Sequence, residues 1–192
     1  LNENTIIGAS AAGGDYEIAQ SLRFNDDDGS YLSRTPSSAG NLKTWTFSAW
    51  VKRGNMGLER PIISVGLVAG DPAFSLYFHT SDQLRCWTNG ANTSFYTNAV
   101  YRDPSAWYHI VLKSSTNSPF YNLYVNGEEV TSFATDNRSN YPGTADREIN
   151  STALHTIGKW YNGGVQTLDC YIGEVNFIDG QALTPDSLGE TG

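Results

Sequence analysis

The chain has 192 residues, the size of one domain, and a β-sandwich of this length buries a full hydrophobic core without metal or disulfide support. It carries 20 acidic residues against 12 lysines and arginines, a formal net charge of -8. Nucleic acids and anionic membranes need clustered basic residues, so this balance argues against both as partners. No run approaches the roughly 20 apolar residues that span a bilayer, and we expect no membrane insertion.

Short strands separated by turn residues are predicted along most of the chain. The clearest alternation places Trp45, Phe47, Ala49 and Val51 on one face. Thr46, Ser48 and Lys52 lie on the other face, as a half-buried strand requires. We expect strands near residues 21–25, 30–34, 45–53, 61–66, 73–79, 83–88, 93–98, 107–114, 120–126, 128–132, 154–160 and 168–178.

The most informative stretch contains two consecutive strand-forming runs, and the second run is interrupted by a turn. Residues 107–113, Trp-Tyr-His-Ile-Val-Leu-Lys, are β-branched and aromatic and alternate faces. Residues 122–130 form a second run, broken by Asn126-Gly127, the strongest short hairpin signal that a sequence offers. Together the two runs predict a strand-turn unit with a tight turn at Asn126-Gly127.

This unit resembles laminin-G-like, or concanavalin A-like, jelly-roll domains, in which a similar strand precedes one ending in an L-Y-V-N-G turn. Three further blocks match in the same order, at residues 21–32, 45–51 and 172–183. The resemblance implies an all-β jelly-roll β-sandwich of two antiparallel sheets. It divides the chain into an N-terminal arm or linker at 1–19, the jelly-roll domain at 20–185 and a C-terminal tail at 186–192.

The longest stretch without strand signal runs from Ala134 to Ser151 and is rich in Asn, Asp, Arg, Ser and Gly. A loop of that length in a compact domain is usually functional or mobile. We therefore treat residues 134–151 as one of the few places for a site.

The two cysteines, Cys86 and Cys170, each lie inside a predicted strand beside an aromatic residue. A disulfide would require their Cα atoms to lie within about 7 Å. Core-like positions favour buried free thiols instead.

Carboxylate spacing argues against a glycoside hydrolase. Such enzymes cleave with two carboxylates, which glucanases of similar fold carry on one strand as E-x-D-x-E, because a period of two puts them on one face. This chain has only Asp15 and Glu17 in that pattern, and the adjacent Glu128 and Glu129 would point to opposite faces. The pattern is not met.

The histidines give no catalytic signal either. His79, His109 and His155 lie within predicted strands, and none accompanies a G-x-S-x-G nucleophile sequence. His109 stands where the resembled family commonly has a scaffold histidine. We therefore predict that the chain is not an enzyme.

An acidic turn between the first two strands is a candidate metal site. Asp26, Asp27 and Asp28 place three carboxylates beside Gly29, and Ca²⁺ prefers such oxygen ligands. Many proteins of the resembled fold hold a calcium ion, which implies a structural Ca²⁺ here. The alternative is a solvated acidic turn that favours Asx-type turns. Gly173 also stands where the family often carries an aspartate after its isoleucine.

Glycan binding needs exposed aromatic rings beside amides or carboxylates, because sugars present apolar C–H faces and many hydroxyls. Two segments supply this combination, and both pair a strand-end aromatic with a glycine-bearing polar loop. Their candidate residues are Trp87, Asn89 and Tyr96, and Trp160, Tyr161 and Asn162. The alternative is that both tryptophans pack in the core or seal its rim.

Residues 175–190 resemble a sequence motif that recurs in structural proteins of tailed bacteriophages, where it forms the C-terminal end of a jelly-roll module. Thr184 and Pro185 within it are typical of a helix N-cap and first helical position. The resemblance implies a non-enzymatic virion module, in a capsid decoration, fibre or tail appendage, that aids attachment to cell-surface glycans. A free-standing lectin or carbohydrate-binding module is the alternative.

For the virion interpretation, the expected partners are other virion proteins and cell-surface polysaccharide. The expected location is the virion surface after assembly in the host cytoplasm. Appendages usually follow cyclic symmetry, so a homo-oligomer is also expected.

Overall fold

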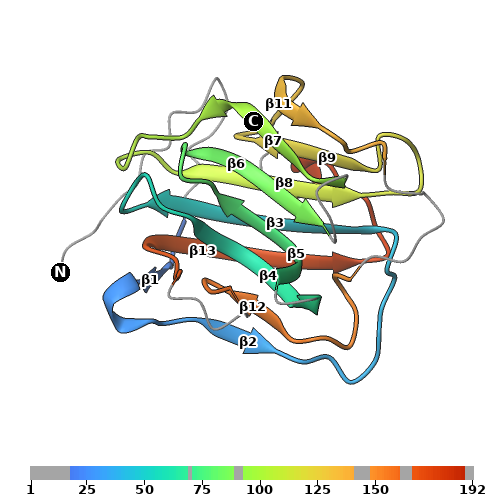
Figure 1. Cartoon of the computed structure of the whole chain (residues 1–192), viewed down its shortest axis with the longest axis horizontal. Coiled ribbons are helices and arrows are strands. Elements are labelled where there is room, and N and C mark those ends of the chain that lie inside the picture. The colour runs from blue at the N-terminus through green and yellow to red at the C-terminus, as the bar shows by residue number, and fades with distance from the viewer. Residues whose placement is uncertain (1–17, 69–70, 89–92, 141–147, 161–165, 189–192) are drawn as a thin grey trace.

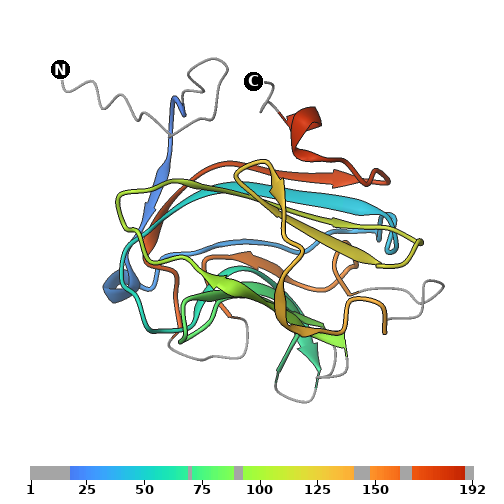
Figure 2. The ribbon, with the colours of Figure 1, turned by 90° about the horizontal axis from the view of Figure 1, so that it is seen from above.

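The computed structural model describes residues 18–68, 71–88, 93–140, 148–160 and 166–188, which form two antiparallel sheets packed face to face (Figure 1, Figure 2). The six-stranded sheet contains, in spatial order, β1 (Leu22–Phe24), β13 (Cys170–Asp179), β3 (Trp45–Arg53), β8 (Tyr108–Ser114), β9 (Tyr121–Val125) and β10 (Glu128–Glu129). The seven-stranded sheet contains β11 (Phe133–Asp136), β7 (Phe95–Val100), β6 (Gln83–Thr88), β5 (Asp71–Phe78), β4 (Arg60–Val68), β12 (His155–Ile157) and β2 (Leu32–Arg34). The predicted all-β sandwich of two antiparallel sheets is confirmed.

Helices are short in the part of the chain that the structure describes. The 3-10 helix η1 (Asp26–Asp28) follows β1, and η3 (Pro185–Leu188) follows β13. The second begins at Pro185, as the Thr184-Pro185 pair predicts. Among the described residues, none of the helices has the length and apolar character to cross a membrane.

The core lies between the sheets and follows the predicted alternation. The inward residues of β3 are all buried: Trp45, Phe47, Ala49 and Val51. Phe74, Leu76 and Phe78 of β5 join them in one cluster. The Trp45 and Phe74 rings meet edge to face with centroids 5.7 Å apart, which ties the two sheets together. Such an aromatic pair contributes about 0.5–1.5 kcal/mol beyond its buried area.

The opposite face of β3 is also buried, because the C-terminal segment covers it. Thr46 and Ser48 are 0% and 1% exposed. The Thr46 hydroxyl donates to the Gln181 carbonyl over 2.8 Å and accepts from the Leu183 backbone N–H over 2.8 Å. Figure 2 shows η3 above the outer surface of the six-stranded sheet. The expected polar face of β3 is therefore an internal surface.

The predicted turn at Asn126-Gly127 is confirmed. Both residues have positive φ, 51° and 80°, as a two-residue type I′ hairpin requires. The turn joins β9 to β10, with Val125 paired to Glu128. Asn126 also accepts the His109 backbone N–H on its side-chain oxygen over 2.8 Å, which links the turn to β8.

One strand lies where the sequence shows none. β11 occupies part of the stretch from Ala134 to Ser151, so the prediction of an unbroken loop there was wrong. β11 is the last strand of its sheet and pairs with β7 through a register shift between Phe133 and Thr135. Its residues alternate only between half-buried and exposed, so they lack the apolar alternation that marks a strand. Residues 141–147 lie outside the described part.

The two cysteines are free and buried, as predicted. Cys86 lies on β6 of the seven-stranded sheet, and Cys170 lies on β13 of the six-stranded sheet. Burial raises the pKa of both thiols well above the ordinary range. Both therefore stay protonated at neutral pH and act as small core residues.

Candidate functional site

The outer face of the seven-stranded sheet faces the reader in Figure 1. It carries a row of aromatic and charged side chains across three strands. Tyr77 on β5 pairs with Arg85 on β6, and Arg85 pairs with Tyr96 on β7. Their neighbours along each strand belong to the core, so strand alternation directs this row outward. The Arg85 guanidinium carbon lies 5.9 Å from the Tyr77 ring centroid and 5.3 Å from the Tyr96 ring centroid. The row therefore holds a cation between two rings.

Two tryptophans extend this row. Trp87 lies two residues after Arg85 on the same face of β6, with its ring 5.1 Å from the guanidinium carbon. Trp160 follows β12, and its indole N–H donates to the Ser75 hydroxyl over 3.2 Å. The Trp160 ring meets the Tyr77 ring edge-on, with centroids 5.2 Å apart. A small residue at Ser75 thus gives Trp160 both space and a hydrogen-bond acceptor.

These side chains enclose a pocket of about 260 Å³, lined by Glu59, Pro72, Tyr77, Arg85, Trp87 and Trp160. Tyr77 is buried, whereas Arg85 and both tryptophans are half-buried. Burial raises the pKa of the Tyr77 hydroxyl and the Arg85 charge partly opposes that rise, so the phenol remains a hydrogen-bond donor at neutral pH. The pocket therefore offers ring surfaces, a guanidinium, a carboxylate and a hydroxyl.

Three of the residues predicted to bind a glycan lie in or beside this pocket. Trp87 and Trp160 line it, and Tyr96 contacts its arginine. The other three predicted residues, Asn89, Tyr161 and Asn162, lie outside the described residues. The structure thus brings together two segments that are more than 60 residues apart in the chain.

Sequence reasoning did not single out Tyr77, Arg85, Glu59 or Pro72. Arg85 and Trp87 do carry a signal, because their spacing of two places both on one strand face. Tyr77 carries none, since only the register of β5 against β6 reveals that it faces Arg85. An arginine two residues before a candidate tryptophan is the sequence feature that could have extended the prediction.

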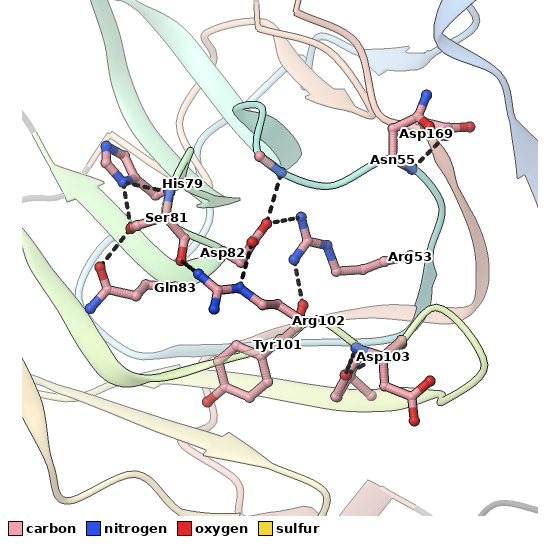
Figure 3. Close-up of polar contacts among 12 residues, drawn as sticks. Arg53, Asn55, His79, Ser81, Asp82, Gln83, Tyr101, Arg102, Asp103 and Asp169 are labelled. Atoms are coloured by element: carbon pink, nitrogen blue, oxygen red, sulfur yellow. Dashed lines mark hydrogen bonds and ion pairs between the residues drawn. The ribbon is translucent and has the colours of Figure 1, made fainter.

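The turn that leads into β6 is held by an ion-pair network (Figure 3). The Asp82 carboxylate accepts from Arg53 Nη2 over 3.0 Å and from Arg102 Nε over 2.8 Å. Arg53 also donates to the Tyr101 carbonyl. Because Asp82 directly precedes β6, the network fixes the start of the strand that carries Arg85 and Trp87.

Asp82 stays ionised at neutral pH. Burial by itself would raise the pKa of this carboxyl, but hydrogen bonds from the Gly57 backbone N–H, Arg102 and Arg53 outweigh burial and lower the pKa. The Gly57 N–H lies 2.9 Å from Asp82 Oδ1. Arg53 is buried as well, and desolvation lowers the pKa of its guanidinium against the opposing effect of Asp82. Arg53 and Asp82 therefore form a buried ion pair that supports the sheet, and the exposed Arg102 completes the network.

The acidic turn forms η1, on the loop between β1 and β2. Asp26 is paired with Arg60 at 2.7 Å, and its backbone carbonyl accepts from the Thr167 hydroxyl. Asp28 accepts from the Asn25 side-chain amide over 3.3 Å. Within the described ranges, no three His, Cys, Asp or Glu side chains converge as a metal-binding group. The three aspartates therefore do not form a ready calcium cage in this arrangement, and calcium binding by Asp26, Asp27 and Asp28 stays a prediction.

The two packed antiparallel sheets form a sandwich of the lectin-like fold. The laminin-G-type model described as the concanavalin A-like lectin/glucanases superfamily matches residues 25–189. The match covers most of the chain, and the protein belongs to this family. The laminin-G-like and concanavalin A-like resemblance seen in the sequence is thereby confirmed. No curated protein sequence matches the chain.

Solved structures with the same fold include a CBM40 module, a pentraxin and part of a sialidase. The CBM40 of Ruminococcus gnavus IT-sialidase, bound to α2,3-sialyllactose, is 17% identical with a TM-score of 0.58, over 82% of this chain and 96% of that chain. The heptameric SAP-like pentraxin of Limulus polyphemus is 16% identical with a TM-score of 0.57, over 82% and 73%. Trypanosoma rangeli sialidase is 17% identical with a TM-score of 0.55, over 76% of this chain but only 22% of the sialidase. At these identities the similarity concerns the fold alone.

Proposed function

We propose that this protein is a non-enzymatic carbohydrate-binding module that holds its glycan in the pocket of Trp87 and Trp160. The observation that carries this proposal is the combination of two half-buried indole rings with Arg85 and Glu59 around one opening. Sugar rings stack their C–H faces on such aromatic surfaces, and charged groups orient their hydroxyls. The pocket of about 260 Å³ suits a single sugar unit at the end of a chain, or one unit within it.

The family supports this assignment, because its fold recurs in a module solved with sialyllactose. The carboxylate content of the pocket supports a binding role without catalysis. Glu59 is the one carboxylate among the described lining residues. Retaining and inverting glycoside hydrolysis both use a pair of carboxylates. A single one can accept hydrogen bonds from hydroxyls but does not supply that pair.

A virion is the biological setting that we propose for this module, as part of a capsid decoration, fibre or tail appendage. The proposal rests on the resemblance of residues 175–190 and on one structural observation. Val175 and Phe177 on β13 are 39% and 36% exposed. β1 pairs with β13 only along Cys170–Ile172, and beyond Gly173, which lies against Ile18 and Gln20, no described strand pairs with this edge. Open edges and exposed apolar residues suit burial between copies or against other virion proteins.

A glycan array probed with the purified protein tests the binding proposal. We expect binding to a defined set of glycans, lost in Trp87→Ala and Trp160→Ala. Tyr171→Ala is the matched control, because Tyr171 is an aromatic residue that is 45% exposed on the other sheet. The array is run with calcium and again with a chelator, so that any role of the acidic turn appears separately. Absence of binding in both conditions overturns the proposal.

A further inference from the structure

Arg85 lies in different surroundings from the arginines that hold the fold together. Five other arginines form ion pairs with aspartates: Arg23, Arg53, Arg60, Arg102 and Arg138. Arg85 forms no such pair with the side chains that the structure describes, and its Nε, like those of Arg53 and Arg60, is buried there without a hydrogen-bond partner. No described carboxylate therefore lies within ion-pair distance of its guanidinium, although Glu59 lines the same pocket.

The aromatic neighbours stabilise the Arg85 cation, and apart from a hydrogen bond with the Tyr77 hydroxyl they leave its Nε–H donor without a partner. The guanidinium carbon lies between 5.1 Å and 5.9 Å from the centroids of three rings, those of Trp87, Tyr96 and Tyr77. A ring attracts a cation through its π face, whereas the five N–H donors of arginine require lone pairs. Because Arg85 lines the pocket, a ligand in the pocket can supply those lone pairs. A carboxylate matches the guanidinium well, since it accepts two parallel hydrogen bonds.

We propose that Arg85 makes the pocket selective for sugars that carry a carboxylate, the class of uronic and sialic acids. This inference rests on the proposed glycan-binding function. The carboxylate of the ligand pairs with Arg85, while the sugar ring stacks on an indole of Trp87 or Trp160. The carboxylate supplies affinity and orientation together, because the fork of the guanidinium fixes its plane.

Glu59 restricts this class further. It lines the same pocket as Arg85 and accepts hydrogen bonds from sugar hydroxyls, but it repels a second negative group. The pocket therefore favours a sugar with one carboxylate and free hydroxyls over densely sulfated or phosphorylated chains. The overall charge of -8 acts in the same direction, because it disfavours polyanions as a whole.

Calorimetric titration tests this inference with pairs of ligands in which esterification removes the charge of one carboxylate. The probes are the methyl glycosides of glucuronic acid and of N-acetylneuraminic acid, each compared with its carboxyl methyl ester. We expect at least one acid to bind about tenfold or more tightly than its ester, as a charge-assisted pair requires. Arg85→Gln should abolish the difference, and Arg85→Lys should retain part of it. Glu59→Gln should bind the acid at least as tightly as the unmodified protein.

The outcomes separate this inference from the proposed function. If acid and ester bind equally, or if Arg85→Gln keeps the preference, the assignment to Arg85 is overturned while glycan binding stands. If the glycan array shows binding of neutral ligands only and Trp87→Ala abolishes that binding, the assignment of the pocket as the glycan site holds but the selectivity for carboxylate sugars is wrong. If no glycan binds in either experiment, both proposals fail. Thermal unfolding of each variant establishes that a loss of binding is not a loss of fold.

Discussion

Trp160 donates its indole N–H to the hydroxyl of Ser75, across 3.2 Å and 85 residues of sequence. This bond attaches the pocket side chain of Trp160, which lies just beyond β12, to the middle of β5. Ser75 is fully buried, and its hydroxyl also lies 2.8 Å from that of Ser64. The buried Ser75 therefore orients Trp160, which we expect to contact the ligand.

Replacing Ser75 by alanine should loosen Trp160. We expect Ser75→Ala to cost about 1 kcal/mol of unfolding free energy and to weaken glycan binding several-fold. Chemical denaturation and calorimetry measure the two effects. Ser64→Ala is the matched control, because it removes the contact between the two hydroxyls but keeps the Trp160 bond. Equal loss of binding in both variants would contradict this role of Ser75.

The ion-pair network at Asp82 should be the most sensitive polar cluster of the fold. Asp82→Asn leaves the buried Arg53 without its carboxylate, which should cost about 3–5 kcal/mol of unfolding free energy. Asp136→Asn breaks a more exposed pair with Arg138 and should cost about 0–1 kcal/mol. Urea denaturation compares the two variants, and similar losses would count against a special role for Asp82.

Stability should fall in acid. The pKa values of Asp26, Asp82 and Asp136 are lowered below the ordinary value of 3.8 in the folded protein. The unfolded chain therefore takes up protons more readily than the folded chain as the pH falls below that value, so acidification favours unfolding. Burial also lowers the pKa of His155 below its ordinary value of 6.5, so we expect a small decrease in melting temperature between neutral pH and about pH 5 and a steep loss below about pH 4. Scanning calorimetry against pH checks this, and Asp82→Asn should flatten the slope.

The open edge of β13 should mediate self-association. We expect light scattering to give the mass of an oligomer for the unmodified protein and a smaller mass for Val175→Lys, because lysine blocks edge-to-edge contacts. Leu58→Lys is the control, since Leu58 is 52% exposed in the loop before β4. If light scattering gives the mass of a monomer at all protein concentrations, the prediction of self-association through β13 is wrong.

Much of this fold could be predicted from the sequence, because period-two alternation and Asn-Gly turns act locally. Trp45 to Val51, Phe74 to Phe78 and the turn at Asn126 lie where these signals place them. β11 was missed because its residues lack apolar alternation. Thr46 looks like a surface residue until the segment that covers it is known.

The candidate site was only partly predictable for a different reason. Trp87 and Trp160 stand out as aromatic residues beside polar loops, but a strand pattern does not say which side of a sheet is the core. Tyr77 and Arg85 become part of the pocket only through cross-strand register, which joins residues that are distant in sequence. The pocket is thus a property of the sheet, and no single segment encodes it.

The five tryptophans allow the most direct test of the central claim, because each indole N–H gives its own signal in a ¹H–¹⁵N NMR spectrum. The protein is titrated with a glycan identified on the array. We predict that the signals of Trp87 and Trp160 shift, while those of the buried Trp45, Trp50 and Trp107 stay in place. Binding that leaves the Trp87 and Trp160 signals unchanged would contradict the assignment of this pocket as the glycan site.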